Sequence, residues 1–191
     1  SPFPQADARL SLAYWRRNAL SPDGEWQKRA RAHADRAVSG DPQLAIGHLA
    51  QGAALAMTGE REKAAAAYEK AATLDPGNPE LLWRMADLAG ARNDVAAAEQ
   101  LFRRAANGSP EEWEPIARLG SFLYRQGRYE EALQAWQRNQ QLAPDYARVY
   151  SNLGAVYHQP DRVNEAPAAF QRALEIAPDS ITYSNLGTML Y

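Results

Sequence analysis

Four polar side chains recur at nearly constant spacing along this chain. They are Arg84, Arg118, Asn152 and Asn185, separated by 34, 34 and 33 residues. An asparagine amide carries both a donor and an acceptor and can bridge the backbone amide of a peptide, while an arginine guanidinium can form two parallel hydrogen bonds to one carboxylate. These four residues, which we call the polar column, therefore indicate the chemistry of binding.

The sequence offers little support for catalysis or metal binding. His33, His48 and His158 lack the i, i+4 pairing typical of helical metal sites, and we expect them to be isolated surface residues. The chain has no cysteine, which excludes disulfides, thiolate metal sites and cysteine nucleophiles. It also contains no glycine-rich phosphate loop and no G-x-S-x-G motif. We predict a protein that is not an enzyme and has no cofactor.

The elements that position the polar column follow a 34-residue period. Five prolines mark the period, and the same small and large residue types recur between them, so one structural unit is copied four times. The prolines are Pro42, Pro76, Pro110, Pro144 and Pro178. The aligned columns are Gly52, Ala86, Gly120 and Gly154; Ala64, Ala98, Ala132 and Ala166; Tyr68, Phe102, Trp136 and Phe170; and Ala71, Ala105 and Ala173, the last interrupted by Asn139.

Each unit is predicted to form two amphipathic helices. In the third unit Ile116, Leu119 and Leu123 follow the spacing of one apolar helix face, and the second half of the unit repeats this pattern. Gly120 is small where the paired helices must approach, while Trp136 supplies a large apolar body. The expected helices are 44–57, 60–73, 79–91, 94–107, 112–125, 128–141, 146–158 and 163–176, with no β-strand.

These columns resemble the tetratricopeptide repeat (TPR) family over roughly residues 43–178. The resemblance implies an all-α fold, in which helical hairpins stack into a solenoid and form a right-handed superhelix. A hairpin cannot bury its apolar face alone, so stacked neighbours share a continuous core. In this family the first helix of each pair lines a concave groove that holds extended or helical peptides.

We expect one solenoid domain over residues 1–191. Residues 43–178 supply four regular repeats, and 1–42 form a degenerate first repeat that caps the array, with helical patterns at 7–20 and 25–39. At the other end, residues 183–187 duplicate residues 150–154 as Tyr-Ser-Asn-Leu-Gly. Residues 179–191 are therefore predicted to be the first helix of a truncated fifth regular repeat.

The resemblance also selects a candidate peptide-binding surface. In the third unit the stripe opposite the core face holds Glu114, Ala117, Arg118, Ser121 and Arg125. The asparagines of the polar column look like the asparagine ladders by which other TPR groups hold peptide backbones, and its two arginines favour an acidic or carboxylate-bearing ligand. The predicted partner-binding residues are Trp83, Arg84, Asp87, Arg118, Ser121, Tyr124, Arg125, Ser151, Asn152, His158 and Asn185.

Two alternatives stay open for these surfaces. Arginine is common on exposed helix faces, so Arg84 and Arg118 could be ordinary surface residues. The corresponding face of the first regular unit is mostly apolar, and it could either pack against the N-terminal helices or form an apolar subsite for a ligand. Its residues are Ile46, Leu49, Ala50, Ala53 and Met57.

Two features near the C-terminus carry further expectations. Pro160 and Pro167 bracket the start of the helix expected at 163–176, and an interior proline would cost about 3 kcal/mol, so we predict a late or kinked start near Asn164. In the last helix Leu186, Met189 and Leu190 would form an exposed apolar edge. We predict self-association through this edge, with a frayed last helix as the alternative.

The composition is that of a soluble globular chain. It has 191 residues, 46% of them apolar and 23% charged, and a formal net charge of −2. This charge gives no electrostatic reason to expect nucleic acid or an anionic membrane as a partner. No apolar run approaches the ~18 residues of a membrane span. The compartment stays open between cytoplasm and periplasm, and because the chain begins with Ser1 we expect the natural N-terminus to have been removed.

Two functions fit these observations. The first is a non-catalytic protein–protein interaction scaffold that binds a peptide or partner protein in its groove, within a larger assembly or a bacterial multidomain signalling protein. The second is the substrate-recruiting arm of a larger enzyme, of the kinase or glycosyltransferase type, whose catalytic domain lies outside this chain.

Overall fold

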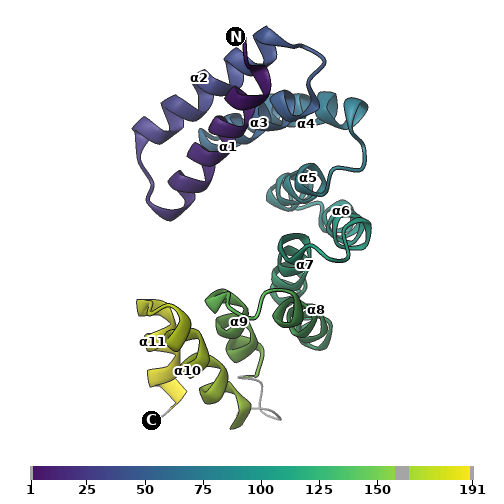
Figure 1. The fold of residues 1–191 in the computed structure, drawn as a ribbon. Coiled ribbons are helices and arrows are strands. Elements are labelled where there is room, and N and C mark those ends of the chain that lie inside the picture. Colours follow the sequence, from purple (N-terminus) through teal and green to yellow (C-terminus); the bar gives the residue numbers. More distant parts are fainter. Residues whose placement is uncertain (1, 158–163, 190–191) are drawn as a thin grey trace. The chain divides into compact units, whose positions relative to one another are not determined.

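The computed structural model describes residues 2–157 and 164–189. Within these ranges every regular element is an α-helix, which confirms the predicted all-α class of helical hairpins (Figure 1). The helices are α1 (Pro4–Leu20), α2 (Gly24–Gly40), α3 (Ala45–Met57), α4 (Arg61–Leu74), α5 (Pro79–Ala91), α6 (Val95–Gly108), α7 (Trp113–Arg125), α8 (Tyr129–Leu142), α9 (Ala147–Tyr157), α10 (Ala166–Ile176) and α11 (Ser180–Met189).

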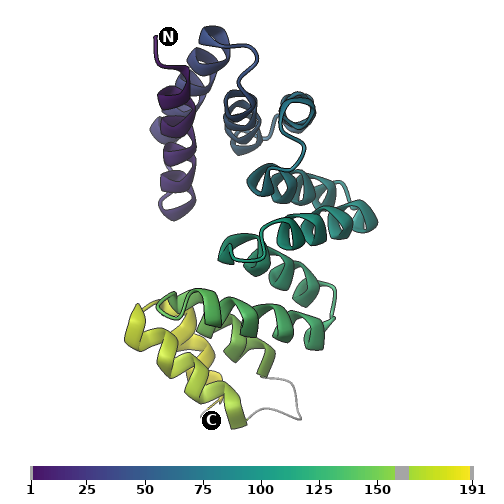
Figure 2. The same cartoon turned by 45° about the vertical axis from the view of Figure 1, so that its right-hand side comes forward.

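The chain forms two compact units, Ser1–Leu101 and Phe102–Tyr191. In the first, α1 packs on α2 and α3 packs on α4; in the second, α7 packs on α8 and α9 on α10 (Figures 1 and 2). The assignment of residues 1–191 to one solenoid domain stays a prediction. No helix among the described residues is long and apolar enough to cross a membrane.

The observed helix bounds follow the sequence pattern closely. From α3 to α8 each end lies within one residue of its expected position. The largest difference at a helix start in the first unit is α1, which begins at Pro4 instead of at residue 7. Pro4 is the first helical residue, where a proline needs no N–H donor and its ring presets φ for a helix. The local pattern therefore determines most helix ends.

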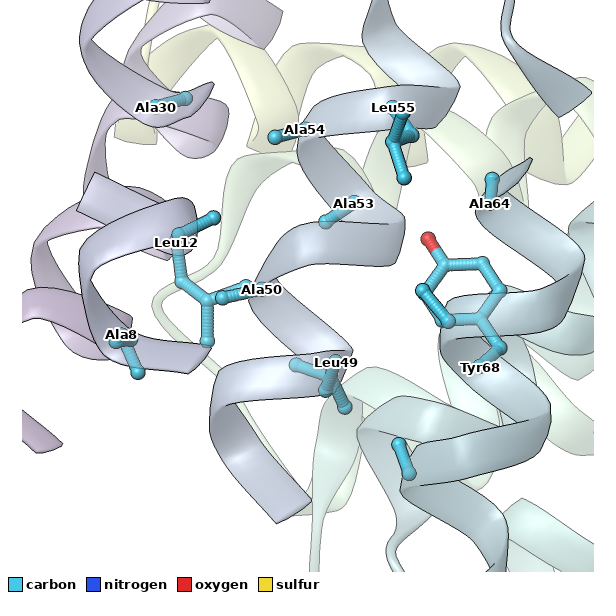
Figure 3. Close-up of a cluster of buried hydrophobic side chains, with 14 of the residues drawn as sticks. Ala8, Leu12, Ala30, Leu49, Ala50, Ala53, Ala54, Leu55, Ala64 and Tyr68 are labelled. Atoms are coloured by element: carbon cyan, nitrogen blue, oxygen red, sulfur yellow. The ribbon is translucent and has the colours of Figure 1, made fainter. Parts of the chain in front are cut away.

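The N-terminal hairpin packs against the first regular unit. Ala8 and Leu12 of α1 and Ala30 of α2 are buried in the same cluster as Leu49 and Ala50 of α3 (Figure 3). The apolar strip on α3 therefore packs against the N-terminal helices, which confirms the first of the two interpretations given above for it.

Two histidines expected on the surface are instead engaged in this region. His33 of α2 places Nδ1 2.7 Å from the buried carboxylate of Asp7, which also accepts two hydrogen bonds from Arg36. His48 is buried, and its Nε2 lies 2.8 Å from the carbonyl oxygen of Pro42. The expectation of isolated surface histidines was wrong for both, because helix packing brings each ring onto an acceptor from another segment.

The turn between the helices of a repeat requires a left-handed backbone. Gly59, Asn93 and Gly127 are spaced by the 34-residue period and have φ values of 80°, 62° and 73°. A Cβ atom disfavours this conformation, and asparagine tolerates it better than most residues. The turn therefore depends on the residue type at this one position.

Gly127→Ala should lower the free energy of unfolding by about 1 kcal/mol, because alanine must adopt the left-handed backbone. Asn93→Gly makes the opposite change at the equivalent position and should leave stability unchanged or raise it by a few tenths of a kcal/mol. Urea denaturation of both variants checks this. Equal stability of the Gly127→Ala variant and the wild type would contradict the turn assignment.

Glu60 connects α2 to the start of α4. Its carboxylate accepts hydrogen bonds from Lys63 at 2.7 Å, from Thr58 at 3.0 Å and from Arg31 of α2 at 3.1 Å. The bond from Lys63, followed by that from Thr58, lowers the pKa of Glu60 from 4.5 to about 2. Because this pKa is lowered in the folded chain, the contribution of Glu60 to stability is present above pH 4.5 and disappears as the pH falls through 2.

Glu60→Gln should therefore reduce stability slightly at pH 7 and have no effect below about pH 2. Thermal unfolding of the two proteins at both pH values measures the difference. An NMR titration of the Glu60 carboxyl that gives an ordinary pKa would contradict the assignment.

The start of α10 agrees with the proline pattern. The helix begins at Ala166, two residues after the expected late start near Asn164, and Pro167 lies in its first turn. At that position a proline removes no intrahelical hydrogen bond, so the helix accommodates it. Pro160 lies outside the described residues.

Candidate functional site

The first unit holds two of the predicted contact residues in its interior. Trp83 and Arg84 of α5 are only 2% and 4% exposed. The guanidinium carbon of Arg84 lies 3.9 Å from the ring centre of Trp15 and 4.5 Å from that of Trp83, so both faces of the group are covered. Its edge donates to Glu80 through Nη2 at 2.6 Å. Arg84 therefore ties α1 to α5, and a ligand carboxylate could reach it only by displacing Glu80.

Trp15 is a site residue that the sequence reasoning missed. It comes from α1 and lies 6.0 Å from Trp83, ring centre to ring centre. The neighbouring Arg16 adds an ion pair to Glu80 at 3.8 Å. A signal was present, since 83 − 15 is 68 residues, or two periods of 34, and the two tryptophans therefore occupy the same repeat position.

A cavity of about 260 Å³ lies beside this tryptophan pair. Aromatic rings and Arg84 form its walls, while the exposed Asp87 and Arg61 belong to its more open part. Burial raises the pKa of the Tyr68 hydroxyl, and the charge and hydrogen bond of Arg84 act in the opposite direction. The lining residues are Trp15, Ala56, Arg61, Tyr68, Trp83, Arg84, Asp87, Leu88 and Ala91.

In the second unit the predicted residues of α7 are half-buried or exposed. Arg118 pairs with Glu114 at 3.4 Å one turn away, and Ser121 donates its hydroxyl to the carbonyl oxygen of Ala117 at 3.0 Å. Arg125 is exposed and forms no hydrogen bond or ion pair with any described residue. Helix α7 thus presents one arginine that is paired and one that is available.

Tyr124 lies on the same helix beside two aromatic rings. Its ring centre is 5.3 Å from that of Tyr129 and 5.6 Å from that of Trp136. Burial, followed by the neighbouring Tyr129, raises the pKa of Tyr124. The tyrosine is only partly buried, so its polar end remains accessible at the edge of an aromatic cluster.

The two asparagines of the polar column have unsatisfied amides. Asn152 of α9 and Asn185 of α11 are half-buried, and neither side chain hydrogen-bonds to a residue in ranges 2–157 and 164–189. Between them, the Ser151 hydroxyl lies 2.8 Å from that of Thr182, which joins α9 to α11. His158, the remaining predicted residue, lies outside the described residues.

Asn139 explains the one break in the alanine columns. Its Nδ2 donates to the carbonyl oxygen of Trp113 at 2.9 Å, where the Trp113 ring lies 4.5 Å from that of Tyr146. Its Oδ1 is buried and accepts no hydrogen bond in the described structure. Asn139 therefore fastens the start of α7 from inside the core and lies away from the polar face.

The described residues contain no group of three or more histidine, aspartate or glutamate side chains that could hold a metal ion. The Asp7 and His33 pair is accounted for by its contacts with Arg36. The polar groups available on these surfaces are amides, a hydroxyl and a guanidinium, which can recognise a ligand through hydrogen bonds and charge.

Comparison with protein families gives one consistent result. Three family models, each described as tetratricopeptide repeat, match residues 28–79, 55–121 and 115–179. Together they cover the chain continuously from residue 28 to residue 179. No curated protein matches the sequence.

Solved structures share the fold at low sequence identity. PilW, described as a widely conserved type IV pilus biogenesis factor, is 16% identical with a TM-score of 0.79, covering 100% of this chain and 87% of its own. A thermophilic TPR protein of Thermus thermophilus is 18% identical with a TM-score of 0.77, covering 98% of both chains. YrrB, described as a TPR protein with an unusual peptide-binding site, is 20% identical with a TM-score of 0.64, covering 95% of this chain and 92% of its own. At these identities the likeness concerns the fold alone.

Proposed function

The chain belongs to the tetratricopeptide repeat family, and from this premise we propose that it is a non-catalytic protein-interaction module that binds a peptide segment of a partner protein. The binding surface in the second unit is the exposed side of the first helices of its hairpins, α7, α9 and α11. Peptide binding by a protein of the same fold, as stated for YrrB, supports this proposal.

The observation that carries the proposal is the pair of unsatisfied amides at Asn152 and Asn185. Asparagine has modest helix propensity, so it gains little from a mid-helix position unless its side chain finds a partner. Each amide is half-buried and makes no hydrogen bond to a described residue. An extended peptide backbone offers both a donor and an acceptor and would satisfy each amide.

The charge of α7 supports an acidic or carboxylate-bearing peptide. Arg125 is exposed and its guanidinium is available for a two-pronged contact with a carboxylate. Arg118 is held by Glu114 at 3.4 Å, a longer and weaker contact than the 2.6 Å bond between Arg84 and Glu80. The preference for acid therefore depends on α7, while Arg84 acts in the packing of the first unit.

The cavity of the first unit offers a second place for a ligand. Its tryptophan and tyrosine walls suit an apolar or aromatic side chain, and Arg61 and Asp87 can hydrogen-bond to the backbone on either side of it. Trp83 and Arg84 support this cavity from within, and Asp87 is the predicted contact residue that a ligand meets first.

The test starts from peptides selected on the full chain from a random display library. Their affinities are then measured by calorimetry for the wild type, for Asn152→Ala and for Arg125→Glu. Each variant should bind about tenfold more weakly or worse, since a lost hydrogen bond to a charged or half-buried group costs about 1–3 kcal/mol. Circular dichroism should show unchanged folding.

Arg104→Glu is the matched control for Arg125→Glu. Arg104 is also exposed and forms no ion pair with a described residue, but it lies on α6, the second helix of its repeat. It should leave affinity for neutral peptides unchanged. Equal binding of the selected peptides to all three variants, or the absence of any selected peptide, would refute the proposal.

A further inference from the structure

The last helix, α11, presents one unpartnered face. The residues of Ser180–Met189 are all uncharged. One side of the helix packs inward, where Thr182 is 2% exposed and bonds to Ser151, and α10 packs beside it (Figure 1). Tyr183 is 57% exposed. Asp179 caps the helix by accepting from the amides of Ile181 and Thr182, so the described helix has a well-formed start.

Gly187 marks a place on this face where an aromatic ring is missing. At the equivalent glycines of earlier repeats a ring from the second helix lies against the backbone: Tyr68 over Gly52, Trp136 over Gly120 and Phe170 over Gly154. A Cβ atom built on Gly154 would lie 2.6 Å from the ring of Phe170, whereas one built on Gly187 meets nothing within 4 Å. The backbone of α11 is thus shaped for a ring that no described residue supplies.

We propose that this face binds a second copy of the same chain, through antiparallel packing of the two α11 helices in which Tyr183 of each copy lies over Gly187 of the other. Tyr183 and Gly187 are four residues apart and share one face of the helix. A twofold axis midway between them exchanges the two positions. Each ring then finds a glycine, and both contacts form at once, as an isologous interface requires.

The absence of charge on α11 favours a second copy as the occupant. Two charged helices of the same sequence would bring like charges together across a twofold axis, and α11 has none to repel. A tyrosine body also buries a large apolar area against a bare helix backbone. One helix pair is a small interface, so the dimer is weak and forms at high protein concentration.

This surface is separate from the proposed peptide contacts on the same helix. Asn185 lies two residues from both Tyr183 and Gly187, and two residues turn a helix by roughly 200°, which places its side chain on the opposite side. Dimerisation and peptide binding can therefore fail independently. Variants at Tyr183 or Gly187 should not change peptide affinity.

Sedimentation velocity and light scattering of the full chain over a range of concentrations test the proposal. The wild type should show a monomer–dimer equilibrium. Tyr183→Ala removes the ring and Gly187→Leu fills its place, and each should weaken dimerisation at least tenfold. Ile181→Ala is the matched control, because Ile181 is 72% exposed on the same helix but lies away from the Tyr183 face. It should leave the equilibrium unchanged.

A wild type that stays monomeric at every concentration would overturn the proposal. So would a dimer that Ile181→Ala weakens as much as Tyr183→Ala does, since the contact would then lie elsewhere on α11. Circular dichroism of Tyr183→Ala and Gly187→Leu should match the wild type. Two independent substitutions keep the test decisive if one of them disturbs folding.

Discussion

Trp136→Ala is expected to lower the free energy of unfolding by about 3–5 kcal/mol, the usual cost of truncating a buried tryptophan. Trp136 is 2% exposed and occupies the large aromatic position of its repeat. Its ring lies against the backbone of Gly120, and its Nε1 donates to the carbonyl oxygen of Ala117 at 3.4 Å. Truncation leaves a cavity between α7 and α8 and removes this bond.

Urea denaturation followed by circular dichroism measures the loss. Tyr129→Ala is the control, because Tyr129 lies in the same aromatic cluster but is 37% exposed, and its truncation should cost much less. A Trp136→Ala variant as stable as Tyr129→Ala would show that the ring does not carry the packing of α7 on α8.

Gly120→Ala is expected to lower the free energy of unfolding by about 1–3 kcal/mol, although glycine to alanine normally favours a helix by about 1 kcal/mol. The added Cβ would lie 2.5 Å from Nε1 of Trp136, too close for any real contact, so the ring or the helix must shift. Gly187→Ala is the matched control at the same repeat position. There the new Cβ meets nothing within 4 Å, and stability should stay the same or rise when measured at low protein concentration.

The double variant Gly120→Ala, Trp136→Ala separates the steric cause from other effects. With the ring gone, the alanine has space, so its cost should disappear and the two substitutions should not be additive. Strict additivity in the free energies of unfolding would contradict the ring-on-glycine packing.

Most of the fold could be predicted because its determinants are local. The period of 34 residues, the apolar stripes and the prolines are visible along the chain, and they place the ends of α3 to α8 within one residue. The start of α1 was missed because Pro4 gives no periodic signal, although its ring favours a first helical position.

The candidate site was less predictable because it depends on contacts between distant segments. Arg84 and Arg118 occupy the same column, yet Trp15 covers Arg84, while Arg118 stays half-buried. Sequence alone does not show that α1 reaches α5. The same holds for Asn139, whose bond to the carbonyl oxygen of Trp113 crosses from α8 to the start of α7. Asn152 and Asn185, by contrast, remain available as the pattern predicts.

Side-chain amide NMR of the full chain with a selected peptide tests the central claim most directly. If the peptide lies along the first helices of the second unit, titration should shift the side-chain amide resonances of Asn152 and Asn185 together with backbone resonances of α7 and α9. The side-chain amide of Asn139, which is buried away from this surface, should not move. Shifts confined to the second helices α8 and α10, with Asn152 and Asn185 unchanged, would contradict the account.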